Sequence, residues 1–201
     1  MIGLIAATRL EAEPIVNNLG LSAGLSDPFP IFENNEVRLI ISGIGKANAA
    51  MATAYLVLCS PLACVCNLGA AGATGEGRSL GACLHVGQVI EPDRMDFTTL
   101  RAKTHAIDTL EGFNTVSLAT QDSPVVDNDQ RRRLALFAEL VDMEAAAVTQ
   151  TCHRLHIRCH VFKFVSDTPE HGDFNLIQDN ILKHREAFAR FFVREVWPRL
   201  V

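Results

Sequence analysis

The sequence predicts an α/β fold built as one domain over residues 1–201. Short apolar runs alternate with longer stretches in which apolar residues recur at helical spacing, which is typical of α/β proteins. The short runs are continuously apolar, as in strands that are buried on both faces. The chain is 48% hydrophobic and 20% charged, so it is too apolar to remain disordered and is long enough to bury a large core.

The expected elements follow in order along the chain. Residues 2–7 are expected to form a buried strand, and residues 8 or 9 to 19 a helix that Gly20 ends. The next strand is expected at 37–41, before a glycine-containing turn and a helix over 46–58. Further strands are expected at 63–67, 86–90, 115–119 and 159–165, and further helices at 129–137 and from 142 or 143 to 155. The longest helix is expected over 175–197, where apolar residues share one stripe.

Charge and composition exclude several classes of protein. The formal net charge of −5 argues against non-specific binding of nucleic acids, which requires a basic surface. No apolar stretch reaches the roughly 20 residues that span a bilayer, and residues 1–7 lack the basic flank of a signal peptide. The six cysteines are interpreted as thiols of a reducing compartment. We therefore expect a cytoplasmic protein with no membrane or nucleic-acid partner.

Two nucleotide-binding motifs are incomplete. The segment GIG at residues 43–45 begins like a dinucleotide-binding fingerprint, but Asn48 occupies the position of the third glycine. The pair GK at residues 45–46 resembles the end of a P-loop, but Ile40 and Ala47 replace the upstream glycine and the hydroxyl residue. Neither motif supports a nucleotide-binding fold of its type.

The segment CHRLHIRCH at residues 152–160 contains residue types that bind metals. It is expected to span a helix end and a strand, so its side chains would diverge instead of meeting at one tetrahedral point. We expect no metal site here.

Three carboxylates stand at predicted strand–helix junctions in apolar surroundings. Glu11 follows the first strand, Glu144 enters an Ala-rich helix, and Asp167 ends the late strand. Each has an ordinary explanation by itself, as a first-turn acid for the two glutamates and as a turn or cap residue for Asp167. At the strand ends of one sheet, however, they would converge on one crevice, where burial favours acid–base chemistry.

Six segments, in this order, resemble the nucleoside phosphorylase/nucleosidase superfamily: IGLIAATRLEAE, ISGIGKANAAMATAYL, NLGAAGA, LHVGQVI, VDMEAAAV and KFVSDTPE. The sequence looks most similar to the branch that contains 5′-methylthioadenosine/S-adenosylhomocysteine nucleosidase and futalosine hydrolase. The resemblance implies a three-layer α/β/α domain around a mixed, twisted sheet. It also implies a homo-oligomeric hydrolase that cleaves the N-glycosidic bond of a purine nucleoside without a cofactor.

The resemblance assigns catalytic roles to the three carboxylates. Glu11 would activate the attacking water, Glu144 would bind the sugar hydroxyls, and Asp167 would donate a proton to the imidazole nitrogen of the purine. Protonating the base makes it a better leaving group, while Glu144 orients the sugar near an oxocarbenium-like transition state. Asp167 must then hold a proton near neutral pH while Glu11 remains ionised.

The resemblance also implies a set of substrate-binding residues. These would pack on the ribose, orient the acid, lie against the base edge and line the glycine-rich loop: Met143, Ser166, Val125, Ala70 and Gly72.

Departures from the family pattern leave two alternatives open. The carboxylate of Glu11 replaces the phosphate-binding loop of the phosphorylases and favours hydrolysis, but Arg9 and Arg38 keep a phosphate-dependent phosphorylase as an alternative. Ala70 stands where the family often has a hydroxyl, and the segment 92–114 is short. A non-catalytic nucleoside-binding protein on the same fold is therefore the second alternative.

Overall fold

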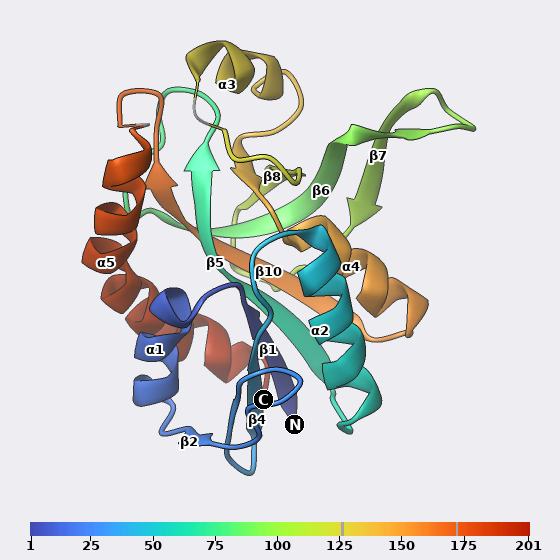
Figure 1. Cartoon of the computed structure of the whole chain (residues 1–201), viewed down its shortest axis with the longest axis vertical. Coiled ribbons are helices and arrows are strands. Elements are labelled where there is room, and N and C mark those ends of the chain that lie inside the picture. Colours follow the sequence, from blue (N-terminus) through green and yellow to red (C-terminus); the bar gives the residue numbers. More distant parts are fainter. Residues whose placement is uncertain (126, 172) are drawn as a thin grey trace.

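The computed structural model describes residues 1–125, 127–171 and 173–201 and shows a mixed β-sheet with helices on both faces (Figure 1). This arrangement confirms the expected three-layer α/β/α fold. The strands are β1 (Ile2–Ala6), β2 (Ser22–Ala23), β3 (Ile31–Glu33), β4 (Val37–Ile41), β5 (Cys64–Ala73), β6 (Cys83–Asp96), β7 (Arg101–Ala106), β8 (Thr115–Thr120), β9 (Leu140–Asp142) and β10 (Arg158–Asp167). The helices are α1 (Arg9–Asn18), α2 (Lys46–Leu58), α3 (Asn128–Leu134), α4 (Ala145–Arg154) and α5 (Phe174–Phe191).

Parallel strands form the centre of the sheet. β1 is parallel to β4 and β5, and β5 is parallel to β10. Beyond β10, the pairing continues from β10 to β6, from β6 to β8 and from β8 to β9. β9 in turn pairs with the end of β5. These five strands close into a ring, so the carboxyl ends of β5 and β10 lie beside the turn that follows β9.

Alternate residues of the central strands enter two apolar cores. Ile5 and Val65 pack in one core with α2 and α4. Leu4 and Cys66 pack in the other core with α1 and α5. Figure 1 shows the two helix pairs on opposite sides of the strands. Burial on both faces is the physical reason why these strands read as continuous apolar runs.

The expected strands at 2–7, 37–41, 86–90, 115–119 and 159–165 are confirmed as β1, β4, β6, β8 and β10. The strand expected to end at residue 67 continues to Ala73 through the glycine-rich segment. A Cβ atom at Gly69 or Gly72 would lie 2.6 Å from a carboxylate oxygen of Glu11 or Asp167, so glycine permits a close approach here without ending the strand. The strands β2, β3 and β9 were not predicted, because two or three residues are too few to show a periodic pattern, and β7 was not predicted because it is largely polar.

The first two helices are confirmed, and the later three begin or end at different residues. α3 ends at Leu134, and α4 begins only at Ala145, because residues 140–142 form β9. The last helix is α-helical to Phe191, followed by a π-helical turn (Phe192–Val196) and a 3₁₀ turn (Trp197–Arg199). Pro198 cannot donate a backbone hydrogen bond, so the α-helical pattern cannot continue through it. In the described part of the chain, no helix combines the length and apolarity needed to cross a membrane.

Phe162 provides a test of the core around β10. Its buried ring stacks on His85, with ring centroids 4.2 Å apart and planes 10° apart. We predict that Phe162→Ala lowers the free energy of unfolding by about 3–5 kcal/mol, because it leaves a cavity. Urea denaturation measures this. Leu58, at the end of α2, is 72% exposed, and Leu58→Ala should change stability by less than about 0.5 kcal/mol. Equal losses in the two variants would contradict the prediction.

Candidate active site

A pocket of about 620 Å³ lies at the edge of the sheet where β5 and β10 end. The eight residues that the sequence singled out all line it: Glu11, Ala70, Gly72, Val125, Met143, Glu144, Ser166 and Asp167. The topology therefore brings together residues from the whole length of the chain. Their proximity agrees with the expected convergence of strand ends, while their roles stay predictions.

Glu11 is held by hydrogen bonds at both carboxylate oxygens. It is the third residue of α1 and forms a capping box with Thr8, whose backbone N and hydroxyl donate to Oε2 over 3.0 and 2.7 Å. The backbone N of Ala70 donates to Oε1 over 2.8 Å. Ala70 thus contributes a backbone donor, for which its missing side-chain hydroxyl is not needed. Three donors stabilise the charged form of a carboxylate at the pocket wall.

Glu144 occupies the N-cap position of α4, but its side chain does not cap that helix. Its Oε1 accepts a hydrogen bond of 2.9 Å from the backbone N of Gly45, which precedes α2. Burial, followed by the charge of Asp142, raises the pKa of Glu144 to about 7. Glu144 is therefore poised to gain or lose a proton near neutral pH.

A buried ion pair lies beneath Glu144. Nζ of Lys163, on β10, is 2.8 Å from Oδ2 of Asp142, and both side chains are buried. Burial alone would lower the pKa of Lys163, but the charges of Asp142 and Glu144 outweigh it and raise that pKa. Asp142 Oδ1 also accepts a hydrogen bond of 2.6 Å from the Thr120 hydroxyl. Lys163 thus balances the negative charge of the acidic turn between β9 and α4.

Asp167 reaches the pocket through an irregularity in β10. The pairing of β10 with β5 shifts register between Val165 and Asp167, which places Asp167 opposite Gly72. Such bulges re-aim side chains near functional sites. The hydroxyl of Ser166 donates to Oδ1 of Asp167 over 2.7 Å, and the guanidinium of Arg131 donates to Oδ2. Both carboxylate oxygens are therefore already acceptors.

The remaining pocket wall is largely apolar. Met143 lines it beside Glu144, and Val125 lies at the side of the loop that leads to α3. Further apolar lining comes from the loop before α2, from β9 and from α5: Ile44, Val141, Ile177 and Ile181. Apolar walls strengthen electrostatic interactions inside the pocket because they exclude water.

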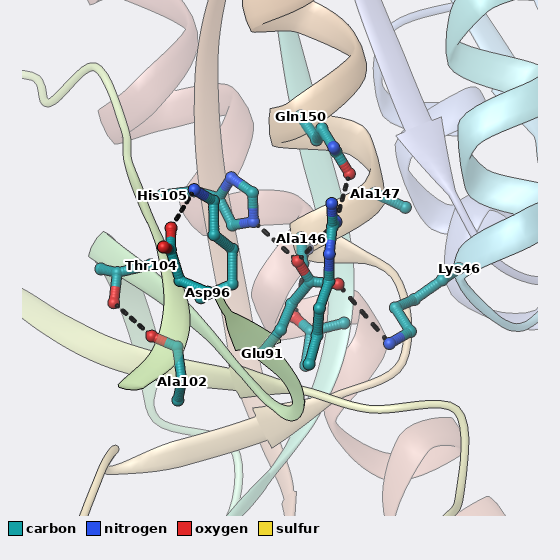
Figure 2. A network of polar contacts seen from close by, with 12 residues as sticks. Lys46, Glu91, Asp96, Ala102, Thr104, His105, Ala146, Ala147 and Gln150 are labelled. Carbon is teal, nitrogen blue, oxygen red and sulfur yellow. Dashed lines mark hydrogen bonds and ion pairs between the residues drawn. The ribbon is translucent and has the colours of Figure 1, made fainter. Parts of the chain in front are cut away.

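A second polar network holds the elements beside the pocket (Figure 2). The buried carboxylate of Glu91 accepts hydrogen bonds from Nε2 of His105 over 2.8 Å and from Arg94 over 3.1 Å. Nζ of Lys46 lies 3.5 Å from Glu91 and 2.9 Å from Asp93. Because Lys46 follows Gly45, this network fixes the start of α2, where the hydrogen bond to Glu144 originates.

Two buried cations at the site were not predicted from the sequence. Lys163 is the lone charge in the apolar run VFKFV, a pattern that requires a buried partner. Arg131 belongs to the run RRR, which resembles a solvated surface. Its spacing from Leu134 and Ala138, which are also buried, is the helical signal that identifies its inward face.

The described residues contain no group of three or more His, Cys, Asp or Glu side chains placed to hold a metal ion. In the segment that was considered for a metal site, Cys152 and Cys159 are buried, whereas His153 and His156 are exposed. The two exposed histidines therefore do not share the buried position of the two thiols.

Known proteins share both the sequence pattern and the fold. The family model of the phosphorylase superfamily matches residues 98–196. The 5′-methylthioadenosine/S-adenosylhomocysteine nucleosidase of Staphylococcus haemolyticus (strain JCSC1435) is 30% identical over an alignment of 197 positions, gaps included, and the alignment covers 83% of this chain and 86% of that protein. The solved nucleosidase of this name from Neisseria meningitidis, in complex with methylthio-immucillin-A, has a TM-score of 0.78 and 26% identity over 96% of each chain. Futalosine hydrolase of Helicobacter pylori strain 26695 has a TM-score of 0.82 at 21% identity, covering 96% of this chain and 95% of that one, and shares the fold.

The raised pKa of Glu144 predicts a pH-dependent loss of stability. The folded protein keeps a proton on Glu144 up to about pH 7, whereas the ordinary pKa of a glutamate in the unfolded chain is 4.5, so unfolding becomes easier as pH rises between these values. Above pH 8, this pKa shift lowers the free energy of unfolding by about 3 kcal/mol. We predict that Glu144→Gln is more stable than the wild type at pH 8 by an amount of this order, and that the advantage shrinks toward pH 4.5. Urea denaturation of both proteins across this range measures the difference. A difference that does not vary with pH would contradict the prediction.

Proposed function

The chain belongs to the phosphorylase superfamily, together with the 5′-methylthioadenosine/S-adenosylhomocysteine nucleosidases, and we propose that it hydrolyses the N-glycosidic bond of a purine nucleoside. The substrate class includes methylthioadenosine, S-adenosylhomocysteine and futalosine types. The observation that carries the proposal is the convergence of Glu11, Glu144 and Asp167 in one apolar pocket. The proposal takes residues 1–201 as one domain, which is supported by the fact that the strands of the described residues belong to one ten-stranded sheet.

Carboxylates suit the charges that develop when this bond breaks. The sugar becomes cationic, and the departing base becomes negative until it is protonated. In the proposed reaction Asp167 gives a proton to the imidazole nitrogen of the base as the C1′–N bond breaks. Water adds its oxygen to C1′ and releases a proton toward Glu11, so the products are the free base and the free sugar. Glu144 binds the sugar hydroxyls, Met143 packs on the ribose, and Ser166 orients Asp167.

The remaining predicted contacts are made to the substrate by the segment at Val125 and by the glycine-rich end of β5. The backbone at Val125 lies against the base edge, and Ala70 and Gly72 form the wall beside Glu11 and Asp167. Their presence in the lining supports this assignment.

The charge of the pocket favours water over phosphate as the nucleophile. Within the described residues, the lining includes no Lys, Arg or His side chain. Arg38 is engaged elsewhere, 2.6 Å from Glu33, and the guanidinium of Arg9 lies over the ring of Phe32. An anionic phosphate would therefore meet carboxylates without a facing cation.

A cytoplasmic homo-oligomer completes the proposal. The six cysteines are free thiols, in keeping with a reducing compartment. The hairpin of β6 and β7 extends away from the body of the molecule (Figure 1), and its tip carries Met95, Phe97 and Leu100 with 54%, 89% and 71% of their surfaces exposed. Exposed apolar groups of this kind support contact with another copy of the chain.

The assembly can be tested at the hairpin. We predict that the wild type has at least twice the monomer mass by light scattering, and that Phe97→Asp shifts it toward the monomer because a charge resists burial. The exposed Leu58→Asp serves as the control and keeps the wild-type mass. A monomeric wild type would contradict the assembly.

Activity tests the proposed chemistry directly. We predict release of free base from at least one adenosine-, inosine-, methylthioadenosine- or futalosine-type nucleoside, at the same rate with and without phosphate. Asp167→Asn and Glu144→Gln should each lower kcat by about 10²–10⁴-fold, since each removes a proton donor or a charge from the transition state. Chromatography of the released base measures the rates.

Glu13→Gln is the matched control, since Glu13 lies on the same helix as Glu11 but is paired with Arg185 away from the pocket. It should retain wild-type activity. A strict requirement for phosphate would identify a phosphorylase instead, and purine binding without turnover would identify a non-catalytic member of the fold.

A further inference from the structure

The residue at the start of α2 cannot cap the helix by itself. This N-cap residue is Gly45, which has no side chain, and the first backbone N–H groups of a helix have no partner within the helix. Two carboxylates from distant parts of the chain bind there instead. Oε1 of Glu144 accepts from the backbone N of Gly45, and Oδ1 of Asp122 accepts from the backbone N of Lys46, each over 2.9 Å. The positive end of the helix dipole favours both anions.

Asp122 belongs to a segment that forms one wall of the pocket. In this segment, residues 121–125, which we call the base-side segment, Ser123, Pro124 and Val125 line the pocket, whereas Asp122 does not. The side chain of Asp122 is 59% exposed. Asp122 therefore connects this wall to α2 from outside the pocket.

Lys46 gives Asp122 a fixed point of attachment. Its Nζ lies 3.8 Å from Oδ2 of Asp122, and on its other side it lies 2.9 Å from Asp93 and 3.5 Å from the buried Glu91, both on β6. Figure 2 shows the contact of Lys46 with Glu91. Ion pairs of exposed groups contribute little to folding stability. The effect of Asp122 therefore lies in where it holds the base-side segment.

The base-side segment is also held at its two ends. The backbone N of Gln121 donates to β9 over 3.1 Å, and the backbone oxygen of Val125 accepts from Arg131 over 3.2 Å. Between these ends, Asp122 reaches α2. Because Glu144 binds the preceding N–H group of the same helix start, the base-side segment and Glu144 are placed relative to each other by a common support.

We propose that Asp122 is a positioning residue that holds the base-side segment against the start of α2 and thereby sets the affinity of the pocket for a purine base. The inference rests on the proposed function, in which this segment lies against the base edge. A wall that is already in place need not be ordered when the base binds, which favours binding. The wall contacts the base in the ground state and in the transition state alike, so its displacement raises KM and leaves kcat nearly unchanged.

Calorimetry with adenine and hypoxanthine tests the proposal without turnover. Asp122→Ala removes the acceptor and should weaken binding of the base by about 3–30-fold, the range for the loss of one helix cap. Asp122→Asn keeps an oxygen for the N–H group of Lys46 and should bind the base within about twofold of the wild type. The control is Asp129→Ala, since Asp129 is likewise exposed and pairs with Arg132 on α3. It should retain the wild-type affinity.

Amide hydrogen exchange, followed by NMR, separates this positioning role from a general structural one. The amide of Lys46 should exchange faster in Asp122→Ala and keep its protection in Asp122→Asn, while the amide of Thr53, in the middle of α2, keeps the wild-type rate in both. Faster exchange throughout α2, or failure of Asp122→Ala to fold, would indicate a structural role and overturn the inference. Unchanged base affinity in folded Asp122→Ala would also overturn it.

Kinetics separates the inference from the proposed function. Asp122→Ala should raise KM by the same factor as the dissociation constant of the base, with kcat within about twofold of the wild type. A fall in kcat at constant KM would contradict the role of Asp122. If base binding weakens as expected but no nucleoside is cleaved, the proposed function fails while the role of Asp122 stands.

The opposite results are equally decisive. If Asp122→Ala cleaves nucleosides with the wild-type KM, the inference fails while the proposed function stands. A wild type that binds neither adenine nor hypoxanthine overturns the inference, and the cleavage assay then decides the proposed function by itself.

Discussion

The burial of four carboxylates at one end of the sheet is the constraint on which the site depends. Each ionised carboxyl group taken out of water has to be compensated, and the fold does this in a different way each time. Backbone and hydroxyl donors surround Glu11, Lys163 pairs with Asp142, and Arg131 pairs with Asp167. Glu144 receives one backbone hydrogen bond, and its pKa rises to about 7. The four carboxylates are therefore compensated unequally.

The same constraint determines the backbone around the pocket. Carboxylates can lie this close to β5 only where the strand has no side chain, at Gly69 and Gly72. The register shift in β10 brings Asp167 to Gly72, and the capping box of α1 turns Glu11 toward Gly69. The glycine-rich strand, the bulge and the helix start are therefore parts of one solution to the burial of charge.

Arginine and lysine have distinct positions behind the pocket. Lys163 lies on β10 beneath the acidic turn before α4, whereas the guanidinium of Arg131 reaches Asp167 from the short helix α3. Because neither cation lines the pocket, the substrate would meet an acidic, largely apolar surface whose charges are balanced from behind. Such a surface suits a transition state with positive charge on the sugar and disfavours an anionic nucleophile.

The sequence by itself determined the fold class, the main strands and helices, and the eight pocket residues, because apolar periodicity and ordered family segments are local signals. It did not predict β2, β3, β7 and β9, which exist through pairing with neighbouring strands, nor the continuation of β5 to Ala73. Only the tertiary structure decided which carboxylate meets which cation. The contacts of Arg131 with Asp167 and of Lys163 with Asp142 join residues 36 and 21 positions apart. The strength of these contacts comes from a shared low-dielectric interior, which exists only after the sheet has closed.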